Sequence, residues 1–450
     1  MHKRKRSQRG VSVGTIFMLA CTIAVLAGFA AILPSFTGNQ DILIDAARLA
    51  VAIDDSFSQL ASTTSQALQN NSQSQQTIIP PFFSHTSTNV KNQPVATEPF
   101  IAATAAPTPT PSPKLSFSLC AAGSVELNSD VRKALTIGQD TRFDLLTDHA
   151  QQAMQADLSI LTLQNTFSSS NNLSSVNMPV ELLSSIRALG VNTINLGHIS
   201  TLNFGEAGLN ETIQAVKAAG MTASGAKEPT NLSLNGVRVA ILHYQNVFSA
   251  TARKQMSAAE RTALISPIQL EQIQADISSV RAAGAHVVAV TLWWGEEKHD
   301  TPSDEQIVQA QAIADAGADL ILGTGNGALQ PVKVLSANRG DGKYHPVLCA
   351  YSLGNLFSPD RESRITLASI LLKTNVVYDT ATHTVAFENL TYTPTYAWRG
   401  KDEGKTIQRI LLNDPAHLPA FVDENQRGVM DRCMTLVTSV MADTAIPMAK

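Results

Sequence analysis

Residues 284–331 read GAHVVAVTLWWGEEKHDTPSDEQIVQAQAIADAGADLILGTGNGALQP, and this stretch decides the fold. An apolar run from His286 to Leu292 is followed by a polar loop, and Ser303 then begins a segment with the S-x-x-Q spacing of a helix capping box. Gly317 ends this helix, because a residue without a Cβ atom adopts the left-handed cap easily. A second apolar run covers Asp319 to Leu322. Strand, helix and strand in this order predict a βαβ unit, in which ligand sites lie in the loops that follow the strands.

The same alternation continues on both sides of this stretch. Apolar runs predict further strands at Ser116 to Ala121, Leu158 to Leu163, Val237 to His243 and Val347 to Leu353. Helical segments lie at 178–189, 206–219, 267–283 and 303–316. A glycine follows each of them, at Gly190, Gly220, Gly284 and Gly317. Helices that end at glycines and lead directly into apolar runs predict a sheet covered by helices.

The pattern changes after Ile365. Three runs rich in β-branched residues, Ile365 to Val377, His383 to Leu390 and Thr391 to Trp398, predict antiparallel strands of a second sheet. Residues 399–450 are expected to form a helical C-terminal extension. The alternating strands and helices before Ile365 and the antiparallel strands after it together predict an α/β fold, arranged as a four-layer α/β/β/α sandwich.

The N-terminal residues predict a membrane anchor. Residues 1–10 form a basic tail, and the uncharged run Val11 to Leu33 is long enough to cross a hydrocarbon core of about 30 Å. Basic residues before this run place the N-terminus in the cytoplasm and the main domain outside, in a single-pass protein of the cell membrane. A cleaved signal peptide, or lipoprotein processing at Cys21, are the alternative interpretations.

Two segments connect this anchor to the main domain. Residues 34–60 carry apolar side chains at helical spacing, which predicts a juxtamembrane helix that either associates with a second copy or lies on the domain. Residues 61–113 are rich in Ser, Thr and Pro, so they cannot bury enough apolar surface to offset the entropy of ordering. We expect a disordered, extended stalk that holds residues 114–398 away from the membrane.

The net charge and the cysteines argue against some partners and binding sites. The net charge of −4 argues against a nucleic-acid partner. Outside the apolar N-terminal run the cysteines are Cys120, Cys349 and Cys433, and the first two lie in predicted strands. We expect these two to be buried as small apolar side chains rather than joined in a disulfide. The sequence has no Cys/His spacing typical of a zinc site.

Short motifs connect the chain to a known family. They are Trp294-Gly295-Glu296-Glu297, Gly323 with Leu329-Gln330-Pro331, and Tyr351-Ser352-Leu353-Gly354-Asn355. On these residues the chain resembles the CapA family, the poly-γ-glutamate capsule-synthesis proteins that are related to metallophosphoesterases. The resemblance implies a sandwich of the metallophosphoesterase type over residues 114–398. It also implies a role in the synthesis or export of a capsule or other surface polymer.

The resemblance also implies where metal ligands would lie, and this chain differs at those positions. Along the chain the replacements are Ser124 for Asp, Gln164 for Glu, His198 for Asn, Ser200 for His, Asn203 for Asp, and Trp293, Thr324 and Gly327 for His. A two-metal site needs carboxylates and histidines, whereas neutral hydroxyl and amide groups bind divalent cations weakly. We therefore expect no divalent metal of the family type and no other cofactor.

The loops after the strands still predict a ligand pocket. Its candidate residues are Ser124, Gln164, Asn165, His198, Ser200, Asn203, Trp293, Trp294, Glu296, Glu297, Thr324, Asn326 and Asn355. Glu296 and Glu297 beside two tryptophans resemble a sugar site, and with His198 they are the candidate catalytic groups. A solvated Glu pair and a structural histidine are the alternatives. We expect Trp293 to fill the volume that histidine ligands and metals would occupy.

Three functions are consistent with these residues. The first is a non-catalytic CapA-like protein that binds a cell-surface polymer or a partner in the capsule synthesis and export machinery. The second is a metal-independent hydrolase or transferase that acts on a cell-surface glycan or phosphoester through Glu296 or Glu297 with His198. The third is a purely structural domain held on its stalk.

Overall fold

The computed structural model describes residues 113–169, 176–295, 298–361, 363–402 and 404–449. The predicted cytoplasmic tail, membrane run and juxtamembrane helix lie outside these residues, as does the stalk except for its last residue. Within the described ranges, no helix combines the length and the apolar character needed to cross a membrane.

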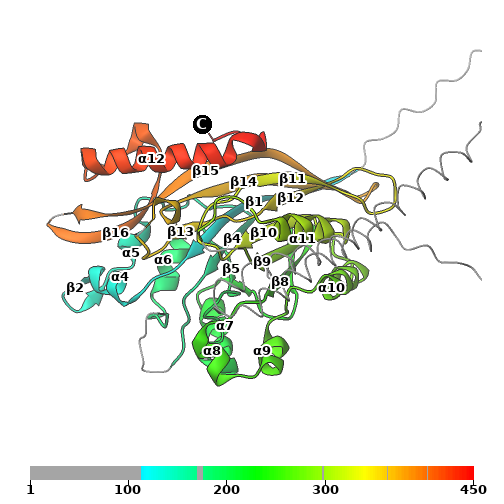
Figure 1. The fold of residues 1–450 in the computed structure, drawn as a ribbon, viewed down its shortest axis with the longest axis horizontal. Coiled ribbons are helices and arrows are strands. Elements are labelled where there is room, and N and C mark those ends of the chain that lie inside the picture. Colours follow the sequence, from blue (N-terminus) through cyan, green and yellow to red (C-terminus); the bar gives the residue numbers. More distant parts are fainter. Residues whose placement is uncertain (1–112, 170–175, 296–297, 362, 403, 450) are drawn as a thin grey trace, which may run out of the picture. The chain divides into compact units, whose positions relative to one another are not determined.

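The first sheet has eight strands in the order β16-β15-β14-β1-β4-β5-β6, with β13 also paired to β1 (Figure 1). Its strands are β1 (Lys114–Val125), β4 (Leu158–Leu163), β5 (Thr193–Asn195), β6 (Thr222–Ser224), β13 (Asn355–Phe357), β14 (Ala368–Asp379), β15 (Thr384–Asp402) and β16 (Lys405–Leu412). β1, β4, β5 and β6 run parallel, whereas β14, β15 and β16 continue the sheet with antiparallel pairings. The sheet is therefore mixed.

The second sheet has six strands in the order β11-β12-β10-β9-β8-β7. Its strands are β7 (Thr230–Leu234), β8 (Val237–Gln245), β9 (Val287–Trp293), β10 (Leu320–Thr324), β11 (Val332–Ala337) and β12 (His345–Ala350). Asp319 is 1% exposed and lies just before β10, where it accepts hydrogen bonds from the backbone N–H of Val288 at 2.8 Å and from the guanidinium groups of Arg281 and Arg339. This buried ion cluster fixes the start of β10 beside β9.

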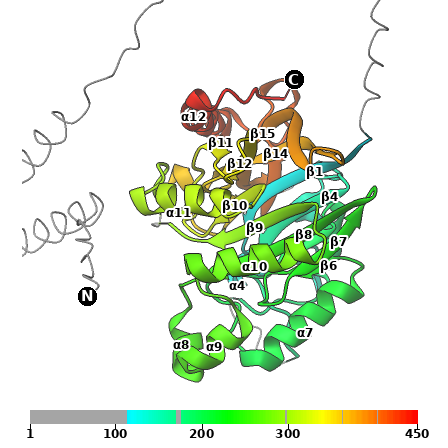
Figure 2. The same ribbon diagram turned by 90° about the vertical axis from the view of Figure 1, so that its right-hand side faces the viewer.

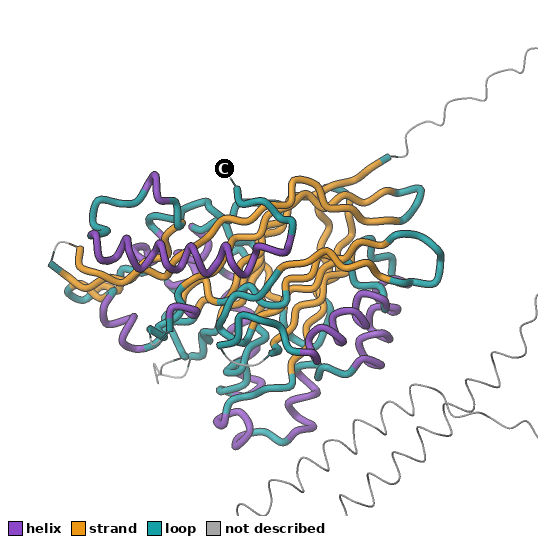
Figure 3. Tube along the Cα trace, turned by 45° about the horizontal axis from the view of Figure 1, so that its top comes forward, coloured by secondary structure: helices purple, strands orange, loops and turns teal. Residues whose placement is uncertain are grey.

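Helices lie around the two sheets (Figure 3). They are α4 (Ser129–Ala134), α5 (Asp144–Thr147), α6 (Leu182–Ala188), α7 (Gly205–Ala218), α8 (Ala250–Gln255), α9 (Ala258–Leu264), α10 (Leu270–Ala282), α11 (Asp304–Asp315) and α12 (Glu424–Met441). Single 3-10 turns occur at η1 (Arg364–Thr366), η2 (Pro415–His417) and η3 (Ala442–Thr444), and a small hairpin pairs β2 (Thr136–Ile137) with β3 (Asp140–Thr141).

Alternating side chains of β9 pack on two different cores. Val287 and Ala289 join the core that contains Phe117 of β1, whereas Val288 and Val290 pack with residues of α10 and α11. Figure 2 shows α10 and α11 over β8, β9 and β10 on the side away from the first sheet. Each fully buried Val or Phe contributes about 1.5–3 kcal/mol to folding. This burial on both faces explains why the strand is a continuous apolar run.

The structure confirms the βαβ unit and its boundaries. Ser303 caps α11 with a capping box, and Gly317 has a φ of +115°, which a residue without a Cβ atom adopts most readily. The α/β class is also confirmed, together with the buried, unpaired state of Cys120 and Cys349. Burial raises the pKa of Cys120 to about 12, so this thiol is inert at neutral pH.

The prediction for the C-terminal strands was wrong in two respects. They do not form the second sheet but extend the first one from β1, and residues 384–398 belong to one long strand, β15, rather than two. Asn389 has a φ of +54° where the β14–β15 register shifts, which explains the break in the sequence pattern. The extension at 399–450 is not wholly helical, because Lys405–Leu412 forms β16.

Candidate functional site

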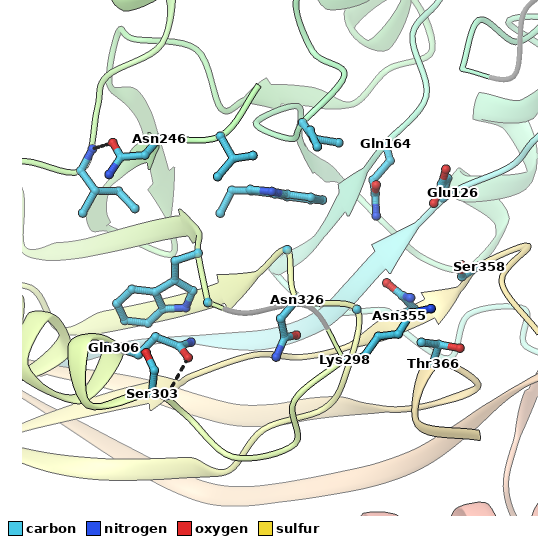
Figure 4. A pocket seen from close by; sticks show the side chains of 18 of the residues that line it. Glu126, Gln164, Asn246, Lys298, Ser303, Gln306, Asn326, Asn355, Ser358 and Thr366 are labelled. Carbon is cyan, nitrogen blue, oxygen red and sulfur yellow. Dashed lines mark hydrogen bonds between the residues drawn. The ribbon is translucent and has the colours of Figure 1, made fainter. Parts of the chain in front are cut away.

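Strand ends from both sheets surround a cavity of about 510 Å³. This volume is typical of small-molecule sites, which span about 300–1,000 Å³. Gln164 follows β4, Trp293 ends β9, Asn326 follows β10 and Asn355 begins β13. Figure 4 shows the amide groups of Gln164, Asn326 and Asn355 around the cavity. The structure thus brings together five of the candidates from the sequence, including Trp294.

A chain of neutral hydrogen bonds forms part of the cavity wall. Gln164 Nε2 donates to Ser124 Oγ at 2.9 Å, and the Ser124 hydroxyl donates to Asn355 Oδ1 at 2.7 Å. The parallel pairing of β1 with β13 places Ser124 opposite Asn355, and Ser124 is 1% exposed. We call these three residues the neutral trio. The Ser124 hydroxyl both donates and accepts within the trio, so this buried group is satisfied without a cation.

Glycines make room for the two tryptophans beside the cavity. A Cβ atom on Gly323 would lie 2.4 Å from Trp294 Nε1, and this nitrogen donates to the Tyr351 carbonyl at 2.7 Å. Gly325 has a φ of +112°, and a Cβ atom there would lie 3.0 Å from the Trp293 ring. Both indoles are held in place by these contacts. Trp293 is 7% exposed and borders the cavity, and whether its ring occupies the volume of the family's histidine ligands and metals stays a prediction.

Asn326 and Gln330 shape the loop that follows β9. Their side-chain amides donate to the His299 carbonyl at 2.8 and 3.2 Å, and Gln330 also donates to the Thr301 carbonyl at 3.0 Å. Gln306 of α11 donates to Gln330 Oε1 at 2.9 Å. The Leu-Gln-Pro motif thus has a structural role here, because Gln330 ties this loop to the start of the helix.

Glu126 is a cavity residue that the motifs do not single out. It lies directly after β1, where the pairing with β13 shifts register between Ser124 and Val125, and its side chain borders the cavity. Burial, and secondarily the nearby carboxylate of Asp360, raise the pKa of Glu126. Lys298 Nζ lies 3.1 Å from Asp360 Oδ2. The carboxyl of Glu126 has no hydrogen bond or ion pair with the residues that the structure describes.

His198 lies behind the cavity wall. Its side chain is buried, and its Nδ1 accepts a hydrogen bond from the backbone N–H of Ser200 at 3.1 Å. Burial, and secondarily the neighbouring His243, lower the pKa of His198 to about 3. The imidazole is therefore neutral at physiological pH and is not part of the cavity surface, which does not favour the role of catalytic base.

His243 is held in one tautomer. The Gln245 amide donates to the carbonyls of His198 and Val247 at 3.2 and 3.1 Å, so its Oε1 must be the atom that lies 3.1 Å from His243 Nε2. Nε2 therefore carries the proton, and Thr291 Oγ1, which donates to the Leu242 carbonyl at 3.1 Å, lies 3.0 Å from Nδ1. Burial lowers the pKa of His243 to about 4. This pair of neutral histidines stabilises the scaffold behind the cavity.

Several candidates from the sequence do not line the cavity. Besides Ser124 and His198, they are Asn165, Ser200, Asn203 and Thr324. Asn165, for example, accepts from the backbone N–H of Leu127 at 2.9 Å and donates to its carbonyl at 2.8 Å, so it fixes the turn after β1. The candidate acids Glu296 and Glu297 lie outside the described residues.

The side chains at the cavity do not fit a dinuclear metal centre. No group of three or more His, Cys, Asp or Glu side chains is arranged to hold a metal among the residues that the structure describes. The neutral trio offers a hydroxyl and two amides that already bond to one another. Asp360 is paired with Lys298. Among the described residues, two adjacent dications would therefore meet separate carboxyl groups but no cluster of anionic ligands of the kind that such a centre requires.

Residues 118–360, more than half of the chain, match the model of a family described as bacterial capsule synthesis protein PGA_cap. The chain belongs to this family. The match runs from β1 to Asp360, so the PGA_cap region contains the neutral trio, both tryptophans and Glu126. β14, β15, β16 and α12 lie beyond it.

Two curated PGA_cap relatives come from Bacillus. The chain is 31% identical over 182 residues to the capsule biosynthesis protein CapA of Bacillus anthracis, which covers 39% of this chain and 42% of that protein. It is 28% identical over 178 residues to the PGA biosynthesis protein CapA of Bacillus subtilis (strain 168), which covers 38% and 43% respectively. The chain thus spans less than half the length of these relatives.

Solved structures similar to this PGA_cap chain are more distant. A novel phosphatase from Mycoplasma pneumoniae matches with a TM-score of 0.36 and 13% identity, over 67% of this chain and 95% of that one. A hypothetical protein from Thermus thermophilus matches with a TM-score of 0.33 and 12% identity, over 62% of this chain and 98% of that one.

Proposed function

We propose that this PGA_cap protein acts in the synthesis or export of a surface polymer by binding a ligand in the strand-end cavity, without metal-dependent hydrolysis. Membership of the PGA_cap family supports a role in the synthesis or export of a surface polymer, because the relatives are named as capsule and PGA biosynthesis proteins. The neutral trio carries the binding role. Gln164 and Asn355 line the cavity and are joined through the buried Ser124 hydroxyl, and Ser124 and Gln164 stand at positions where the CapA resemblance implies metal ligands.

The chemistry of the trio supports binding over hydrolysis. A dication held by Ser124 and Asn355 would break the hydrogen bond between them and would gain only neutral ligands in return. An amide wall instead presents fixed donors and acceptors to a polar ligand, at little entropic cost on binding. Gln164 and Asn355 both line the cavity, so each can donate a remaining amide hydrogen to such a ligand.

The location belongs to the same proposal. Val11 to Leu33 would anchor the chain as a single-pass membrane protein, with residues 1–10 in the cytoplasm and the PGA_cap region outside. Residues 61–113 would hold that region at a distance from the membrane. The ligand is then a cell-surface polymer or a component of the machinery that makes and exports it.

Binding without cleavage is the property to test. The full-length chain, purified in detergent, is incubated with surface polymer isolated from the producing cells, and both co-sedimentation and polymer length are measured. We expect the chain to sediment with the polymer and the length distribution to stay unchanged. Depolymerisation, or turnover of a model phosphodiester that the neutral-trio variant Ser124→Ala loses, would contradict the proposal.

The position and raised pKa of Glu126 support one alternative to a binding protein, a metal-independent hydrolase or transferase. A carboxyl whose pKa is raised by burial in a cavity can serve as a general acid, and Glu126 is better placed for this than the buried His198. This alternative predicts turnover of a glycan or phosphoester that Glu126→Gln abolishes. Equal rates for the unmodified chain and the variant would rule it out.

A further inference from the structure

The charges around the cavity do not suit an anionic ligand. Among the described residues, the ionisable groups that line the cavity are the carboxyl groups of Glu126, Glu305 and Asp360 and a single cation, Lys298. Lys298 already lies 3.1 Å from Asp360 Oδ2. An incoming carboxylate or phosphate would therefore meet carboxyl groups without a cation available to offset them. A ligand that carries positive charge would be attracted instead.

The rest of the lining suits a sugar. Trp293 and Trp294, which are 7% and 5% exposed, border the cavity with the small uncovered part of their rings, and amide groups such as those of Gln164 and Asn246 supply both donors and acceptors. Aromatic rings pack on the apolar faces of pyranose rings, whereas amides bond to their hydroxyl groups. Figure 4 shows Gln164 and Glu126 across the cavity from Ser303 and Gln306, so polar groups meet a ligand from two sides.

Glu126 is the group that selects among sugars. It borders the cavity, it is half-buried, and its carboxyl has no partner among the described residues. A buried carboxylate without a partner is unfavourable unless a donor or a cation reaches it. A ligand ammonium would provide both, through a charge-assisted hydrogen bond.

We propose that the cavity binds an amino sugar with a free ammonium group, placed so that the ammonium pairs with Glu126 and the pyranose packs against Trp293 or Trp294. This inference rests on the proposed binding function and names the class of ligand. Binding of the ammonium would return the carboxyl of Glu126 toward its ionised form, because an adjacent positive charge opposes the effects of burial and of Asp360.

Isothermal titration calorimetry with three probes tests this inference. The full-length chain in detergent is titrated with the trimer of glucosamine, the trimer of N-acetylglucosamine and an oligomer of γ-linked glutamate, at a pH below the pKa of the sugar amine. The two sugars differ by the ammonium charge and the acetyl group. We expect the glucosamine trimer to bind about tenfold more tightly than the acetylated trimer, the equivalent of one charge-assisted hydrogen bond. The glutamate oligomer should not compete with it.

Two variants locate the effect. Glu126→Gln should weaken the glucosamine trimer about tenfold and change the acetylated trimer by less than about twofold. Glu181→Gln makes the same change of charge at an exposed residue outside the cavity, and should leave both affinities within about twofold. Thermal unfolding confirms that both variants fold.

Three outcomes of the titrations would overturn the inference, and a fourth result separates it from the proposed function. Equal affinity for the two sugars would mean a glycan site without preference for an ammonium group. Competition by the glutamate oligomer would mean that the cavity takes an anion. The absence of binding by either sugar would exclude the amino-sugar class, while the proposed function would still stand if the chain sediments with surface polymer. Loss of that co-sedimentation, with sugar binding intact, would instead contradict the proposed function.

Discussion

Replacing Ser124 with alanine tests whether the neutral trio stabilises the fold. The hydroxyl donates to Asn355 Oδ1 at 2.7 Å and accepts from Gln164 Nε2 at 2.9 Å. Asn355 is 6% exposed, so the loss leaves a buried acceptor without its donor, at a cost of about 1–3 kcal/mol. Gln164 is half-buried at the cavity and its amide can bond to water instead. Losing its hydrogen bond to Ser124 therefore adds little to the loss of stability. We expect the free energy of unfolding to fall by about 2 kcal/mol.

The assay is thermal and denaturant unfolding of the full-length chain, followed by circular dichroism. A loss of about 2 kcal/mol corresponds to a decrease of roughly 4 °C in Tm for a domain of this size. Ser116→Ala is the matched control, because Ser116 lies on the same strand with an exposed side chain and should change stability by less than about 0.5 kcal/mol. If Ser124→Ala is as stable as this control, the trio does not form as described.

Two further changes probe the cavity wall. Trp294→Phe removes the indole donor to the Tyr351 carbonyl, so we expect a loss of about 1–3 kcal/mol in denaturant unfolding, and a variant as stable as the unmodified chain would contradict the packing described. Because its folded-state pKa is raised, Glu126 contributes stability below its unfolded pKa and loses that contribution as the pH rises through the folded value. Glu126→Gln should therefore raise Tm relative to the unmodified chain at neutral pH but not at acidic pH, and a pH-independent difference would contradict this assignment.

Local signals in the sequence were sufficient for the βαβ unit. Ser303 caps α11 through its own side chain and Gly317 ends that helix through its own backbone, so both are readable without knowledge of the partners. Strand pairing is different, because it depends on residues far apart in the chain. β14 pairs with β1, more than two hundred residues earlier, and no local pattern distinguishes this pairing from a separate second sheet.

The site was predictable to a similar degree. The rule that loops after parallel strands meet at one edge brought Gln164, Trp293 and Asn355 together correctly. It did not show that the loop after β5 turns inward and buries His198, because this depends on Gln245 and the neighbouring strand. The same rule could have identified Glu126, since it lies in the loop directly after β1, but Glu126 belongs to no motif.

Metal binding by the full-length chain is the most direct test of the central claim, that the cavity binds its ligand without a metal centre. The purified protein is incubated with excess Mn²⁺ or Zn²⁺ and passed through a desalting column, and the metal retained per chain is measured by plasma mass spectrometry. Ser124→Ala serves as the comparison, because it disrupts the trio. We expect no stoichiometric metal with either protein. One or two ions retained by the unmodified chain and lost from the variant would contradict the account.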